Sequence, residues 1–172
     1  VFSDLHTESP MMQQVRDDAM QYAQYDMTLL LTGVYGTDKS TLPQCIHNAS
    51  TRSNGPYVTL SMTGLTGEMQ PVQFYGSRGE HEVKSVFEIA HGGTLFIEHV
   101  DLLDSQSQFQ LLSVLRDGFL KRLDGRAYLP VDVRIICSTN QDLYILVQQG
   151  SFYESLYRRI TQLELRVPTL RE

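Results

Sequence analysis

The chain has 172 residues, of which 41% are hydrophobic, and it carries a net charge of −6. This length and composition suffice for one domain with a hydrophobic core and exclude a disordered chain. The net negative charge argues against nucleic-acid binding by this segment, because phosphate binding needs clustered Lys and Arg. Any DNA contact is therefore expected from a separate domain.

Cysteine usage and the absence of targeting signals bear on the cellular compartment of the protein. Cys45 and Cys137 lie in apolar surroundings and match no metal-ligand spacing, so we expect two small buried residues in a reduced, cytoplasmic protein. The sequence contains neither a signal peptide nor an apolar stretch of about 18 residues, so it predicts no export and no membrane span. It begins without Met and stops without a closing element, so residues 1–172 are expected to be one domain of a longer protein.

A helix, a buried strand and a phosphate-binding pattern open the chain. Ser9 and Pro10 are typical of a helix start, and apolar residues recur at helical spacing to about residue 25. The apolar run at 27–31 predicts a strand. The next eight residues read GVYGTDKS, which has the spacing G-x-x-x-x-G-K-[ST] except that Asp38 replaces the second glycine.

This loop predicts a nucleotide site, with one feature against it. Backbone N–H groups of such a loop cradle phosphates, and Lys39 adds a point charge. A glycine before the lysine lets the backbone approach the phosphates closely, whereas Asp38 adds a Cβ and a negative charge. Lys39 is therefore either a phosphate ligand or merely the start of the following helix.

Helices and strands alternate through the rest of the chain. Pro43 is awkward for a helix that begins near Lys39, because proline removes a backbone donor. The further expected elements are a strand at 57–61, a loop at 64–76, a helix at 82–90, a strand at 94–97, a helix at 105–117, hairpin strands at 119–123 and 127–130, a strand at 132–139, helices at 141–149 and 152–160, and a strand at 162–167.

Two details of this pattern bear on packing and topology. In the helix at 105–117 we expect Phe109, Leu112 and either Leu115 or Leu111 to face inward. Asp124 and Gly125 give the strongest hairpin signal in the chain, and the charged residues around this hairpin are expected to face solvent. Alternating strands and helices predict a mostly parallel sheet covered on both faces, with ligand bound at the carboxyl ends of its strands.

The order of these motifs resembles the AAA+ domain of bacterial enhancer-binding transcription regulators, the sigma-54 activator family. The stretches that carry the resemblance are 33–40, 52–58, 91–97, 131–140, 150–160 and 167–172. The resemblance implies a three-layer α/β P-loop NTPase fold with a mostly parallel five-stranded sheet, a small β-hairpin insertion and a helical lid beyond Glu172. It also implies nucleotide-binding roles for Gly33, Gly36, Thr37, Asp38, Lys39, Ser40 and Asn140.

The chain departs from the family where hydrolysis is performed. The family has Asp-Glu after its third strand, to orient magnesium and to activate water, whereas this chain has Glu98 and His99. Glu98 is expected either to hold Mg²⁺ together with Ser40 or to pair with Lys39 in an empty pocket. His99 is expected to be a rim histidine rather than a base. Ser61 replaces the asparagine that holds the catalytic glutamate.

Two further positions concern the neighbouring subunit. Tyr153 and Arg159 match the two trans arginines of the family, which stabilise charge in the phosphoryl-transfer transition state. Arg159 either reaches a neighbour's pocket or ties down its own helix end. Asn140 either senses a γ-phosphate or is an ordinary turn residue.

The partner and the function follow from these departures. The family projects a Gly-Ala-Phe-Thr-Gly-Ala loop that grips sigma-54, and residues 77–88 lack it. We therefore expect a sigma-54-independent regulator domain that self-associates, contacts RNA polymerase or other regulator domains, and binds ATP and Mg²⁺ weakly with little hydrolysis. A separate domain would bind DNA. The alternatives are a working ATPase that uses Lys39, Glu98 and Arg159, or a pocket for another anionic effector.

Overall fold

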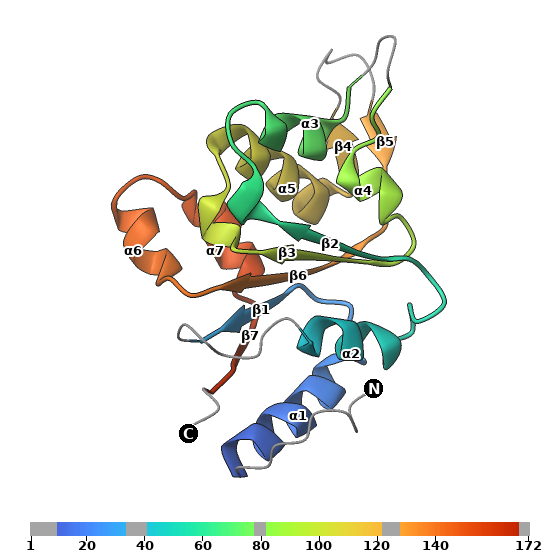
Figure 1. Cartoon of the computed structure of the whole chain (residues 1–172), viewed down its shortest axis with the longest axis vertical. Helices are drawn as coiled ribbons and strands as arrows, with labels where there is room; N and C mark the ends of the chain where they lie inside the picture. Colours follow the sequence, from blue (N-terminus) through green and yellow to red (C-terminus); the bar gives the residue numbers. More distant parts are fainter. Residues whose placement is uncertain (1–9, 34–40, 78–81, 122–127, 169–172) are drawn as a thin grey trace.

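The fold is a five-stranded parallel sheet between two helical layers (Figure 1). The computed structural model describes residues 10–33, 41–77, 82–121 and 128–168. The strand order is β2-β3-β6-β1-β7, and all four neighbouring pairs are parallel. The strands are β1 (Leu29–Thr32), β2 (Tyr57–Ser61), β3 (Thr94–Glu98), β6 (Arg134–Thr139) and β7 (Leu163–Arg166).

The helices cover both faces of this sheet. In Figure 1, α1 (Pro10–Tyr22) and α2 (Leu42–Asn48) lie below the sheet. Above it lie α3 (Met69–Tyr75), α4 (Val86–Ile89), α5 (Ser105–Asp117) and the hairpin of β4 (Phe119–Lys121) with β5 (Tyr128–Pro130). Helices α6 (Leu143–Gln148) and α7 (Glu154–Ile160) follow β6, and two short 3-10 turns are η2 (Met62–Gly64) and η3 (Val100–Leu102). The predicted three-layer α/β fold with a parallel five-stranded sheet and a β-hairpin is therefore confirmed.

Two hydrophobic clusters, one on each face, hold the layers together. Successive side chains of a strand point to opposite faces, so an unbroken apolar run serves a sheet that is covered on both sides. Leu29 and Leu31 pack into the cluster with α1 and α2, whereas Leu30 packs into the cluster with the other helices. Cys45 and Cys137 are both buried, as predicted. Within the described ranges, no helix combines the length and the apolar character needed to cross a bilayer.

The loop predicted at 64–76 is wrong, because α3 occupies most of it. Pro71 lies in the first turn of α3, where its missing N–H costs nothing, and Gly76 ends the helix with a φ of 77°. Likewise, α2 begins at Leu42, so Pro43 lies at the helix start and removes no hydrogen bond. In both segments, a proline lies in the first turn of a helix, where it is tolerated.

Two helical expectations needed correction above the sheet. The helix predicted at 82–90 is only α4, which begins after Ser85, while Val83 pairs with Ser77 in an antiparallel bridge. Ser85 caps α4 in a capping box with Glu88. The prediction that Phe109 faces inward is also wrong, since Phe109 is 55% exposed. Leu112 and Leu111 are buried, as predicted, so only the Phe109 edge of the predicted inward face is wrong.

Two stretches that carry the family resemblance pack against each other at the amino ends of β2 and β3. The Thr94 N–H donates to the Pro56 carbonyl at 2.9 Å, and Arg52 donates to the Gly93 carbonyl at 3.4 Å. A Cβ on Gly93 would overlap the Pro56 carbonyl oxygen. The glycine is therefore required by close backbone approach.

A buried histidine joins this contact to the helix α2. His47 is 3% exposed, with Nε2 3.2 Å from the Gly55 carbonyl and Nδ1 2.7 Å from the Thr94 hydroxyl. Because a carbonyl only accepts, Nε2 carries the proton and Nδ1 accepts from Thr94. Burial lowers the pKa of His47, and the hydrogen bond to Gly55 offsets part of that shift.

We expect this histidine to make stability depend on pH. Below its ordinary pKa of about 6.5 the unfolded chain binds a proton that the folded chain resists, so stability is lost as pH falls, by at most about 1.4 kcal/mol per pH unit. Urea unfolding of wild type and His47→Gln at pH 7.5 and 5.5 measures this effect. The loss should be larger in wild type, and equal losses in the two proteins would contradict the assignment.

Candidate functional site

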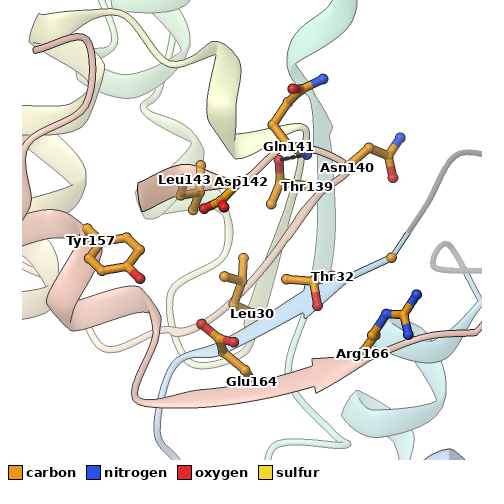
Figure 2. A pocket seen from close by; sticks show the side chains of 11 residues that line it. Leu30, Thr32, Thr139, Asn140, Gln141, Asp142, Leu143, Tyr157, Glu164 and Arg166 are labelled. Carbon is orange, nitrogen blue, oxygen red and sulfur yellow. Dashed lines mark hydrogen bonds between the residues drawn. The ribbon is translucent and has the colours of Figure 1, made fainter. Parts of the chain in front are cut away.

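A hollow of about 350 Å³ opens at the carboxyl ends of β1, β6 and β7 (Figure 2). This is the edge at which parallel sheets bind ligands. The hollow is lined by Leu30, Thr32, Gly33, Thr139, Asn140, Gln141, Asp142, Leu143, Tyr157, Glu164 and Arg166. Of the predicted nucleotide-binding residues, Gly33 and Asn140 line it. Gly36, Thr37, Asp38, Lys39 and Ser40 lie outside the described residues.

Sheet register brings the walls of this hollow together. Thr32, the last residue of β1, is the register partner of both Thr139 on β6 and Arg166 on β7. Figure 2 shows Glu164 and Arg166 on β7 across from the segment that follows β6. Leu30 and Leu143 add apolar surface. The hollow therefore combines a cationic group, carboxylates, hydroxyls and amides over an apolar floor, which suits a polar organic ligand.

The turn that carries Asn140 is held by side-chain hydrogen bonds on both sides. The buried hydroxyl of Thr139 donates to Oδ1 of Asp101 at 2.7 Å and accepts from the Gln141 N–H at 3.0 Å. Asp142 then caps α6 by accepting from the Tyr144 N–H at 3.0 Å. These bonds fix the backbone before and after Asn140, so its place at the hollow is defined by the fold.

The residues that stand at the family's hydrolytic positions form a separate group at the ends of β2 and β3. Ser61 and Glu98 are register partners, and the Ser61 hydroxyl donates to Oε1 of Glu98 at 3.4 Å. Nε2 of His99 lies 3.6 Å from the same carboxylate oxygen. None of these three residues lines the hollow. Among the described residues, no group of three or more His, Cys, Asp or Glu side chains is arranged to hold a metal ion.

The two positions matched to trans arginines also lie apart from the hollow. Tyr153 occupies the N-cap position of α7 without a side-chain capping hydrogen bond, and its ring packs against Phe109 at a tilt of 39° with 4.6 Å between centroids. Arg159 lies in the last turn of α7, where the helix dipole favours a cation. Tyr153 therefore packs within its own domain, whereas both alternatives for Arg159 stay predictions.

The sequence interpretation missed two residues that organise this region, Asp101 and Gln108. Gln108 is buried, donates to the carbonyls of Leu103 and Ser151 at 3.0 Å each, and accepts from the Tyr153 N–H at 2.8 Å. It thus joins the segment after β3 to the start of α7. The available signal was a polar residue at i−3 and i−4 from Leu111 and Leu112, on the buried face of α5.

Comparison with known sequences shows the protein family to which this chain belongs. The family model described as Sigma-54 interaction domain matches residues 5–166. The DNA-binding transcriptional regulator NtrC of Bradyrhizobium sp. (strain RP501 Parasponia) is 35% identical over 170 residues, which cover 95% of this chain and 35% of that protein. The glycerol metabolism operon regulatory protein of Citrobacter freundii is 36% identical over 173 residues, which cover 99% of this chain and 27% of that protein.

Solved structures agree with the sequence matches. NtrX from Brucella abortus in complex with ADP has a TM-score of 0.89 and 32% identity, covering 98% of this chain and 38% of that one. The P-loop NTPase domain of a sigma-54 transport activator from E. coli has a TM-score of 0.66 and 21% identity, and the match covers 96% of this chain and 99% of that one. At this identity the match shows a similar fold and nothing more. This chain spans about a third of the length of its curated relatives: it covers 35% of the NtrC protein and 27% of the glycerol metabolism operon regulatory protein.

Proposed function

This chain belongs to the sigma-54 interaction domain family, and we propose that it acts as the AAA+ domain of a cytoplasmic bacterial transcription regulator whose nucleotide site binds ATP but hydrolyses it poorly. In this proposal the domain self-associates and contacts RNA polymerase or other regulator domains. A separate domain binds DNA. The observation that carries the proposal is the hollow at the carboxyl ends of β1 and β6, next to a phosphate-binding pattern with one substituted glycine.

Nucleotide binding is supported by the residues that line the hollow. Gly33 opens the phosphate-binding pattern directly after β1, and Asn140 directly follows the neighbouring strand β6, so both line the same space. The related NtrX from Brucella abortus was solved in complex with ADP. Lys39 and Ser40 supply the groups that would meet phosphate and Mg²⁺, whereas Asp38 opposes a triphosphate by its charge.

Poor hydrolysis is supported by the contacts of the substituted residues. Oε1 of Glu98 lies 3.4 Å from the Ser61 hydroxyl and 3.6 Å from Nε2 of His99. His99 itself stands where the family has its water-activating glutamate. The side chain of Tyr153 packs against Phe109, so this position supplies no cation to a neighbouring site. Arg159 remains as the one arginine of the family pair.

Sigma-54 independence is supported by the segment between β2 and β3. Ser77 and Val83 close a short antiparallel bridge, and α4 begins soon afterwards at Val86. The sequence across this bridge is charged and lacks the Gly-Ala-Phe-Thr-Gly-Ala motif. A partner surface of a different chemistry, on RNA polymerase or on another regulator domain, fits this segment better.

Titration of the full-length protein with a fluorescent ATP analogue and Mg²⁺ tests nucleotide binding. We expect saturable binding to wild type that weakens about tenfold or more in Lys39→Ala, because the loop loses its point charge to the phosphates. Arg158→Ala is the matched control, since it also removes a cation but from the exposed surface of α7. Equal affinity of wild type and Lys39→Ala would overturn the nucleotide assignment.

A further inference from the structure

Asp101 lies behind the wall of the hollow and contacts the turn that carries Asn140. His99 adopts a left-handed backbone conformation, with φ 62° and ψ 55°, which is uncommon for a residue with a side chain. The chain then enters η3, which brings Asp101 to the end of β6. There Oδ1 of Asp101 accepts the hydroxyl proton of Thr139 at 2.7 Å.

This hydrogen bond determines what the Thr139 hydroxyl can do next. A hydroxyl donates one proton and accepts through its lone pairs, and an ionised carboxylate only accepts. With its proton directed to Asp101, Thr139 accepts from the Gln141 N–H at 3.0 Å. The hydroxyl therefore links the carboxylate to the backbone on the far side of Asn140.

The burial of Thr139 makes this link specific. Thr139 is 1% exposed, so water does not replace a lost partner easily, and its β-branched side chain has few rotamers. The distance of 2.7 Å is that of a well-formed O–H···O hydrogen bond. Asp101 does not itself line the hollow, whereas Thr139, Asn140 and Gln141 all do.

We propose that Asp101 is a positioning residue that, through Thr139, holds the Asn140 turn in the geometry that distinguishes ATP from ADP. The inference rests on the proposed nucleotide site, in which Asn140 meets the terminal phosphate. The carboxylate acts by accepting one proton from Thr139. An amide oxygen at the same place can do the same, whereas an alanine cannot.

Amide hydrogen exchange in the absence of nucleotide tests whether Asp101 holds the Asn140 turn. In the full-length protein, the Gln141 N–H should exchange about tenfold faster in Asp101→Ala than in wild type, because its acceptor is released, and should stay near the wild-type rate in Asp101→Asn. Asp117→Ala is the matched control, since Asp117 is an exposed carboxylate at the far end of α5. Equal rates in Asp101→Ala and Asp117→Ala would overturn the proposal.

The ratio of the ADP to the ATP dissociation constant tests whether this turn distinguishes the two nucleotides. Asp101→Ala should bring this ratio close to one, and Asp101→Asn should keep the wild-type ratio. If Asp101→Asn instead changes the ratio as much as Asp101→Ala, the charge rather than the hydrogen bond acts, and the proposal is wrong. If wild type binds neither nucleotide, the proposed function fails, and the exchange rates still decide whether Asp101 positions the turn.

Discussion

Replacement of Arg134 by methionine is expected to lower the free energy of unfolding by about 4 kcal/mol. Arg134 is 1% exposed and donates to the carbonyls of Tyr22, Ala23 and Met27 at 2.7, 3.2 and 3.3 Å. These carbonyls lie at and just after the end of α1, where a helix leaves acceptors without intrahelical partners. Methionine fills similar space but removes all three of these donors, and within the described residues only the Tyr22 carbonyl keeps another partner, the Tyr25 N–H at 3.1 Å.

The charge of Arg134 is favoured by the nearby aspartate Asp26 and opposed by a second arginine, Arg52. Burial lowers the pKa of Arg134 to about 10, and Asp26 partly opposes that shift, so the guanidinium stays charged at pH 7. Asp26 in turn accepts from Arg52 at 2.8 Å, and this hydrogen bond lowers the pKa of Asp26. Arg52 also reaches Asp132 at 2.7 Å, so the network joins the end of α1 to the start of β6.

Chemical denaturation of Arg134→Met measures the predicted loss. Arg158→Met serves as the matched control, because Arg158 pairs with Glu154 on an exposed helix surface, and pairs of that kind contribute about 0.5 kcal/mol or less. A loss below about 1 kcal/mol in Arg134→Met would show that the carbonyls find other partners and that α1 does not depend on this contact.

Restoring glycine at Asp38 should tighten ATP binding about a hundredfold. At an effective dielectric near 20, a carboxylate about 4 Å from a phosphate charge costs about 4 kcal/mol, and salt screening reduces this to the predicted change. Asp38 lies outside the described residues, so the expectation rests on its place in the phosphate-binding pattern.

Titration with a fluorescent ATP analogue at 0.15 M salt tests this expectation in the full-length protein. Asp38→Asn separates the two effects, since asparagine removes the charge but keeps a side chain near the phosphates. It should recover part of the gain, and Asp38→Gly should recover all of it. Unchanged or weaker binding by Asp38→Gly would mean that the aspartate is not the obstacle.

Much of the fold could be predicted because its elements carry local signals. Strand Tyr57–Ser61 and helix Ser105–Asp117 have the predicted bounds, and the helix is marked by a capping Asp104 and a left-handed Gly118. Helix α3 was missed because Pro71 and Gly76 also fit a loop, and only tertiary packing of Phe74 against Phe87 distinguishes the two. Local pattern predicts elements better than it predicts such ambiguous segments.

The candidate site was predictable where it follows from strand order. Gly33 and Asn140 directly follow the neighbouring strands β1 and β6, so parallel topology brings them to one edge. The contact between Asp101 and Thr139 was not predictable, because it depends on the left-handed turn at His99, and no sequence pattern marks a histidine for that conformation. Long-range hydrogen bonds of this kind leave no periodic signal in the chain.

The most direct test of the account is the identity of the nucleotide that the protein holds. Full-length wild type and Lys39→Ala would be incubated with radiolabelled ATP and Mg²⁺, separated from free nucleotide, and assayed for bound ATP and ADP over time. The account predicts that wild type retains mostly ATP, with only a minor fraction of ADP throughout the time course. Accumulation of ADP on wild type that Lys39→Ala abolishes would contradict it and would establish a working ATPase.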